Sequence, residues 1–150
     1  ALGRLLENRE TVMDDCRAVM DVLGDCSTIE KELESVSSEM EVVTGLIQKL
    51  IVENATRKLD QNDYRRKYEG YVNKYAALES RMDSLKKDRE SREIKFGIFS
   101  GFLFELSELE ELPLEFDVKL FHSLVDYATV YHDGRVVFAF RNGAEVETRI

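Results

Sequence analysis

Cysteine and proline are both scarce in this chain of 150 residues, which contains two cysteines and one proline. Two cysteines provide no disulfide framework, and neither Cys16 nor Cys26 has histidine or cysteine partners at the spacing that a zinc site requires. Because the single proline, Pro113, comes late in the chain, long helices are permitted almost everywhere before it.

Long apolar runs are also missing. The longest run, residues 96–106, is interrupted by Ser100, Gly101 and Glu105, and is shorter than the roughly 20 residues of a membrane-spanning helix. A hydrophobic content of 43% nevertheless excludes wholesale disorder. No signal peptide is visible and the chain begins inside a predicted helix, so we expect it to be part of a longer cytoplasmic protein that is not bound to a membrane.

Sequence patterns of catalysis are absent. HExxH, GxSxG, CxxC and a glycine-rich phosphate loop do not occur. His122 and His132 are too few and too isolated for a metal or proton-transfer site, and we interpret His122 as a packing residue. Both cysteines are interpreted as buried thiols. The sequence therefore predicts no catalytic residues, no metal and no cofactor within this chain.

Positive charge is limited, since 21 lysines and arginines face 30 acidic residues and the net charge is −9. A protein that neutralises DNA phosphates needs a cationic face. The local exception is a basic cluster that contains Arg57, Lys58, Arg65, Arg66 and Lys67. We interpret this cluster as a solvated helix face of mixed charge, so the chain alone is not expected to bind nucleic acid.

The strongest positive signal is a heptad rhythm in two consecutive runs, which is typical of a coiled coil. The predicted seam consists of Ile29, Leu33, Val36, Met40, Val43, Ile47 and Leu50, then Tyr64, Tyr68, Tyr71, Tyr75, Leu78, Met82 and Leu85. Asp60 can cap the second helix, and the short connection makes the two helices antiparallel. We expect a coiled-coil arm over residues 27–92 with its tip near residues 58–63.

Two glycines interrupt the arm helices. Gly45 and Gly70 each cost about 1 kcal/mol inside a helix. Either they relieve crowding beside the seam tyrosines or they let the arm bend, and the sequence does not decide between these readings.

Residues 1–26 and 93–150 are expected to form a base. A first helix should end with Gly24 as its C′ residue, Ser27 or Thr28 should cap the arm helix, and Asp117 should cap a short helix after Pro113. Asp133-Gly134 and Asn142-Gly143 predict the turns of a three-stranded meander whose buried face carries Val136, Phe138 and Phe140. The expected fold is mainly α, with a long antiparallel two-helix coiled-coil arm projecting from a small α+β base.

Two stretches carry a resemblance to a known family. The first is Leu59-Asp60 followed by Tyr64-x3-Tyr68-x-Gly70-x4-Tyr75-x2-Leu78. The second is Phe116-Asp117, Leu124-Val125-Asp126, then Thr129-Val130-Tyr131-x-Asp133-Gly134-Arg135-Val136-Val137-Phe138-x-Phe140-x-Asn142-Gly143. Together they resemble the carboxy-terminal coiled-coil region of large serine recombinases, the serine integrases and resolvases of mobile elements. The resemblance covers nearly the whole chain.

The resemblance implies a parent enzyme of DNA recombination and integration whose catalytic domain, recombinase domain and zinc ribbon lie upstream. The family's nucleophilic serine and zinc-binding cysteines match no position here, so zinc is expected upstream only. The implied partners are other subunits of the same recombinase through the arms, DNA through the parent protein, and a directionality factor. Arg135, Arg141 and Arg149 are candidates for contacts with the DNA backbone in the parent protein.

The predicted interaction site is the arm tip, which comprises Arg57, Lys58, Leu59, Gln61, Asn62, Tyr64, Arg65 and Arg66. An exposed Leu59 ringed by charge would suit a weak, selective contact. In the other reading, Leu59 folds back and seals the end of the coiled coil against Asn54 and Tyr64. Two other functions stay open. One is a free-standing helical-hairpin protein, such as a prefoldin-like chaperone or scaffold; the other is a nucleic-acid clamp like the arm of seryl-tRNA synthetase, which the acidic balance disfavours.

Overall fold

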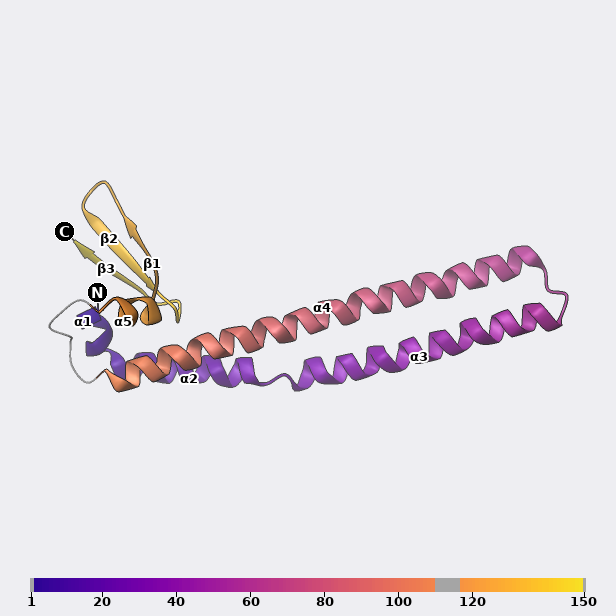
Figure 1. Ribbon diagram of the computed structural model, residues 1–150, viewed down its shortest axis with the longest axis horizontal. Coiled ribbons are helices and arrows are strands. Elements are labelled where there is room, and N and C mark those ends of the chain that lie inside the picture. The colour runs from indigo at the N-terminus through magenta and orange to yellow at the C-terminus, as the bar shows by residue number, and fades with distance from the viewer. Residues whose placement is uncertain (1, 110–116, 150) are drawn as a thin grey trace. The chain divides into compact units, whose positions relative to one another are not determined.

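The protein is mainly helical, with a small antiparallel sheet near its carboxy terminus (Figure 1). This computed structural model describes residues 2–109 and 117–149. The elements in chain order are α1 (Leu2–Glu7), α2 (Arg9–Gly24), α3 (Ser27–Thr56), α4 (Gln61–Glu108), α5 (Val118–Leu124), β1 (Val125–Val130), β2 (Arg135–Phe140) and β3 (Glu145–Arg149). The predicted fold class is confirmed: long helices are combined with a three-stranded antiparallel sheet.

The chain divides into two compact units. The arm is the continuous segment Cys26–Ser91, and the base consists of Ala1–Asp25 together with Arg92–Ile150. The arm predicted from the sequence covers residues 27–92, so each of its two boundaries differs by one residue from that of the structure. The helix α4 contributes its residues 61–91 to the arm and its residues 92–108 to the base.

In the arm, α3 and the first part of α4 lie side by side and run in opposite directions (Figure 1). Every second seam residue of α3 is buried, namely Ile29, Val36, Val43 and Leu50. Across the seam, Leu85 is buried, and Leu78 and Met82 are half-buried against the same cluster. This alternation along one helix face is the packing that a heptad repeat produces.

The helix ends around the junction of α2 and α3 differ from the prediction. Gly24 is the last residue of α2 and does not adopt a positive φ, so its predicted role as a left-handed C′ residue is wrong. A Cβ atom at Gly24 would lie 3.5 Å from the ring of Phe96, which is ordinary van der Waals contact, so this site does not require glycine. The predicted cap of α3 is also wrong, because Ser27 is already helical and Cys26 holds the N-cap position without a side-chain hydrogen bond.

The arm glycines stand in open space. A Cβ atom added at Gly45 or at Gly70 would meet no atom within 4 Å. The reading in which these glycines relieve crowding beside the tyrosines is therefore wrong, because there is no crowding to relieve.

The core of the base joins segments far apart in the sequence. Its most deeply buried side chains are Phe102 and Leu106 of α4, Leu124 of α5 and Cys16 of α2. Arg9 fastens the end of α4, since its guanidinium donates to the carbonyl oxygens of Ser107 and of Leu109, the latter at 2.8 Å. Carbonyl groups in the last turn of a helix lack intrahelical hydrogen-bond donors. At this end of α4, the guanidinium of Arg9 provides the donors.

The sheet has the order β1-β2-β3, with antiparallel pairs throughout. Gly134 and Gly143 have φ values of 80° and 86°, and these left-handed conformations confirm the two predicted glycine turns. Val136 and Phe140 are buried and Phe138 is half-buried, as predicted. Asp117 caps α5, because its Oδ1 accepts hydrogen bonds from the amides of Lys119 and Leu120 at 2.8 and 3.2 Å.

Three expectations about the base are not confirmed by the structure. His122 is exposed, so its interpretation as a packing residue is wrong. The first helical region is divided into α1 and α2 at Asn8. Pro113, before which long helices were expected, lies outside the described residues.

Candidate functional site

The tip of the arm is a short, hydrogen-bonded loop. Residues 57–60 connect α3 to α4, and Asp60 caps α4 through its Oδ1, which accepts the amide of Asp63 at 2.8 Å. The carboxylate of Asp63 lies in the first turn of α4, where its negative charge interacts favourably with the positive end of the helix dipole. The predicted cap is confirmed.

Gln61 ties the loop to both helices. Its Nε2 donates to Asn54 Oδ1 of α3 at 2.9 Å and to the carbonyl oxygen of Leu59 at 3.1 Å. Leu59 is half-buried, so the expectation of an exposed leucine at the tip is wrong. The amide of Leu59 donates to the carbonyl oxygen of Arg57 at 2.9 Å, so the backbone of the loop turns tightly here.

The other tip residues lie mostly in solvent. Arg57, Lys58, Gln61, Asn62, Arg65 and Arg66 are exposed, and Tyr64 is half-buried. The ring of Tyr64 stacks on that of Tyr68 with centroids 6.0 Å apart. Arg66 pairs with Asp63 at 2.7 Å. The tip is therefore a cationic end whose side chains are largely solvated.

Ion pairs flank the seam in the part of the arm far from the tip. Arg81 of α4 pairs with Glu32 of α3, and Lys74 lies 4.0 Å from Glu39. One heptad nearer the tip, the same two positions hold Lys67 and Leu46. An apolar side chain thus replaces the carboxylate, and the flank of the seam changes from ionic to apolar.

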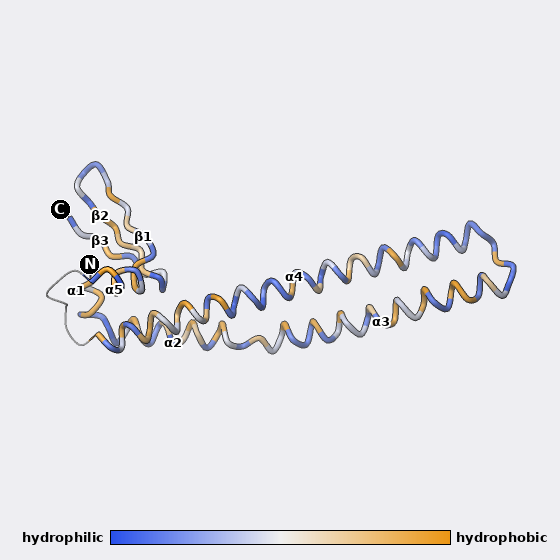
Figure 2. The backbone as a smooth tube through the Cα atoms, viewed as in Figure 1, coloured by the Kyte–Doolittle hydropathy of each residue, from blue (hydrophilic) through white to orange (hydrophobic). Residues whose placement is uncertain are grey.

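The exposed large apolar side chains of the arm gather in the half nearer the tip. They are Val42 (63% exposed), Leu46, Ile51 and Val52 (59%) on α3, and Tyr68 and Val72 on α4. We call these six residues the distal apolar set. Figure 2 shows hydrophobic segments recurring along α3 toward its end at the tip.

The distal apolar set lies outside the heptad seam, so the heptad periodicity of the sequence does not reveal it. The available signal is the stretch 42–52 of α3, in which Lys49 is the only charged residue. Its apolar side chains point in all directions around the helix. A helix that is hydrophobic all round is normally covered on more than one side, whereas α4 covers only the seam side.

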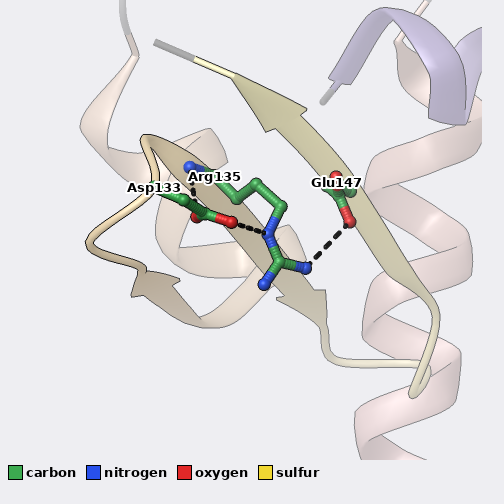
Figure 3. Close-up of polar contacts among 3 residues, drawn as sticks. All are labelled: Asp133, Arg135 and Glu147. Carbon is green, nitrogen blue, oxygen red and sulfur yellow. Dashed lines mark hydrogen bonds and ion pairs between the residues drawn. The ribbon is translucent and has the colours of Figure 1, made fainter.

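The three carboxy-terminal arginines occupy different environments. Arg135 donates from Nε to Asp133 at 2.6 Å, and its Nη1 lies 3.7 Å from Glu147 (Figure 3). The hydrogen bond from Arg135 lowers the pKa of Asp133. Arg141 donates from Nε to the carbonyl oxygen of His122 at 2.8 Å, while Arg149 is exposed. The charge of Arg135 is largely balanced, and the guanidinium of Arg141 fastens β2 to α5.

The two cysteines lie apart from one another in the described part of the chain, and neither belongs to a group that could hold a metal ion. Cys16 is buried and accepts a weak hydrogen bond at its Sγ from Asn142, and Cys26 is half-buried at the start of α3. Within residues 2–109 and 117–149, no three histidine, cysteine or acidic side chains are grouped so that they could hold a metal. In the same part of the chain, no helix combines the length and apolarity that crossing a membrane requires.

Comparison with protein-family models, with curated proteins and with solved structures found no match to this chain.

Proposed function

We propose that this chain is the coiled-coil region of a site-specific serine recombinase and that its arm makes the subunit–subunit contacts that synapse two DNA sites. The observation that carries the proposal is the position of the distal apolar set. Every exposed large apolar side chain of the arm lies in the half nearer the tip, between Val42 and Val72.

The contact surface we propose is the side of the distal arm rather than the tip loop. Exposed apolar side chains such as Val42 and Val52 gain free energy when a partner removes them from water, by about 25 cal/mol per Å² of apolar area. Leu59 has already lost much of its exposure within the arm. The cationic tip residues form the rim of this surface and favour partners that present acidic side chains.

A surface of six side chains gives a weak contact, and weakness suits synapsis. Arms that associate only weakly in solution will meet once DNA holds two subunits close together, because tethering raises their effective concentration. The sequence resemblance supplies the rest of the proposal: a cytoplasmic recombinase that contacts DNA through its other domains and whose arm contacts determine, with a directionality factor, which site pairs recombine.

The test uses the full-length protein that contains this chain. Val52→Lys places a charge in the distal apolar set, and Ser38→Lys places the same charge two heptads earlier, at the equivalent exposed position of α3. We expect Val52→Lys to reduce bridging of two DNA sites roughly tenfold, which corresponds to about 1.4 kcal/mol. Ser38→Lys should leave bridging unchanged, and both variants should bind a single site normally.

Two outcomes would overturn the proposal. Unchanged bridging by Val52→Lys together with Val42→Lys would show that the distal apolar set is not the contact. A reading frame upstream of Ala1 without a four-cysteine ribbon and a serine-containing catalytic domain would remove the recombinase assignment. The helical-hairpin chaperone or scaffold would then be the better reading of the same apolar surface.

A further inference from the structure

The two edges of the sheet are protected very differently. The edge strand β3 carries Glu145, Glu147 and Arg149, the charged side chains with which proteins commonly prevent unwanted strand pairing. The other edge strand, β1, is exposed from Asp126 to Val130 and has no charged residue between Tyr127 and Tyr131. Within the described part of the chain, β1 pairs only with β2, so its outer edge is open.

The open edge is complementary to itself. The sequence from residue 127 to residue 131 is Tyr-Ala-Thr-Val-Tyr, which has Thr129 at its centre. If a second β1 ran antiparallel to the first about a two-fold axis at Thr129, Tyr127 would face Tyr131 of the copy and Ala128 would face Val130. Aromatic pairs and threonine pairs across strands each stabilise antiparallel sheets.

The backbone of β1 fits the same register. The amide of Tyr131 donates to the carbonyl oxygen of Arg135 at 2.8 Å, and the following pairs in the register are Thr129 with Val137 and Tyr127 with Ala139. Because hydrogen-bonded pairs alternate along an antiparallel ladder, the odd-numbered residues bond to β2. The even-numbered residues Ala128 and Val130 therefore direct their N–H and C=O groups to the open edge. In the two-fold register these residues face each other and can form a hydrogen-bonded pair.

Charge does not oppose the pairing at this edge. The whole chain carries −9, yet residues 127–131 bring no like charges together. Asp126, at the irregularity of β1, and His132, in the turn that follows the strand, flank this segment and lie outside the paired residues. Exposed side chains at the edge, among them Val130 (69% exposed) and Tyr127 (56%), would lose contact with water on association.

We propose that β1 is a homodimerisation edge, at which a second copy of this chain adds its own β1 antiparallel to the first about a two-fold axis at Thr129. The sheets of both copies then become continuous. This interface is separate from the distal apolar set and does not depend on the function proposed for the arm. Its small size predicts a weak association.

Disulfide trapping tests both the contact and its register. Thr129 would face its own copy in a non-hydrogen-bonded pair, with Cα atoms about 4.5 Å apart, within the range of about 4.4–6.8 Å that disulfides span. In a Cys26→Ser background, we expect Thr129→Cys to form a covalent dimer under mild oxidation. Glu145→Cys, equally exposed on the opposite edge, is the matched control and should remain monomeric.

The register also predicts which pairs of cysteine variants form a disulfide. Tyr127→Cys alone should not form a dimer, whereas an equimolar mixture of Tyr127→Cys and Tyr131→Cys should form the mixed disulfide. Equal cross-linking of Thr129→Cys and Glu145→Cys would reflect random collision and would overturn the proposal. Cross-linking of Tyr127→Cys with itself would overturn the register.

Reversible association provides a test without oxidation. In sedimentation equilibrium, the 150-residue chain should show a monomer–dimer equilibrium, and Thr129→Lys should abolish it by placing two lysines opposite each other. Glu145→Lys should leave the equilibrium intact. A wild-type chain that stays monomeric up to millimolar concentration would overturn the proposal, and this result would not affect the DNA-bridging test of the arm.

Discussion

Gln61 of α4 donates a hydrogen bond across the end of the arm to Asn54 of α3, with Nε2 and Oδ1 2.9 Å apart. The same amide donates to the carbonyl oxygen of Leu59. We therefore expect Gln61→Ala to lower the free energy of unfolding by about 0.5–1 kcal/mol, the net contribution of exposed hydrogen bonds of this kind. Urea titration of the chain measures the change. Asn62→Ala, at the next and equally exposed position, should change stability much less; equal effects would show that the Gln61 bonds do not matter.

Leu59 should matter for folding more than for recognition. Because its side chain is half-buried in the loop, Leu59→Asp should destabilise the chain by about 1 kcal/mol, part of the roughly 1.5–3 kcal/mol for a fully buried leucine. Thermal unfolding followed by circular dichroism measures this. Val52→Asp, in the distal apolar set, should leave the unfolding temperature almost unchanged. A larger loss of stability in Val52→Asp than in Leu59→Asp would contradict this prediction and would favour Leu59 as an exposed contact residue.

The arm glycines offer a stabilising change. No atom lies within 4 Å of the Cβ positions of Gly45 and Gly70, so alanine fits at either site. Each substitution should raise the free energy of unfolding by about 1 kcal/mol, the difference in helix propensity between glycine and alanine. Gly143→Ala, by contrast, should destabilise the chain, because Gly143 has a φ of +86° that an L side chain rarely adopts. Denaturant titrations of the three variants check both signs.

The chain alone should bind duplex DNA poorly. Its net charge is −9, and Arg135 is already balanced by Asp133 and Glu147. Fluorescence anisotropy with a labelled duplex should show no submicromolar, sequence-selective binding at physiological salt, and a shallow dependence on salt concentration. Tight binding with a steep salt slope would contradict this expectation and would favour the nucleic-acid clamp.

Stability should fall at alkaline pH through Cys16. Burial raises the pKa of this thiol in the folded chain, although the hydrogen bond from Asn142 opposes the shift. The unfolded thiol loses its proton first, so above its ordinary pKa of about 8.5 the folded state holds more protons and loses stability as pH rises. Urea titrations between neutral and alkaline pH should show this loss in the wild type and a smaller loss in Cys16→Ala. Parallel pH profiles would contradict it.

Features with a fixed spacing could be predicted from the sequence. The heptads of α3 and α4, the caps Asp60 and Asp117, and the turns at Gly134 and Gly143 all depend on a few neighbouring residues. Features that depend on distant neighbours could not. Gly24 ends α2 without the left-handed conformation expected of it, and the nearness of the Phe96 ring to Gly24 appears only in the packed structure.

The candidate site could be predicted only in part from the sequence, because it too depends on contacts between distant residues. The exposure of Leu59 depends on how the loop closes, which the composition of the loop does not reveal. The distal apolar set was readable as a nearly uncharged stretch of α3, but only a packed structure shows that no part of α4 covers Val42 and Val52.

The division of the base into two segments, Ala1–Asp25 and Arg92–Ile150, has a consequence for biosynthesis. The arm is continuous and rich in local contacts, so it can form its helical hairpin as soon as α4 leaves the ribosome. The first segment of the base must wait, with Leu5 and Cys16 uncovered, until Phe102, Leu124 and Phe140 have been synthesised. During translation the arm therefore folds first, and the base is completed only when the last strands emerge.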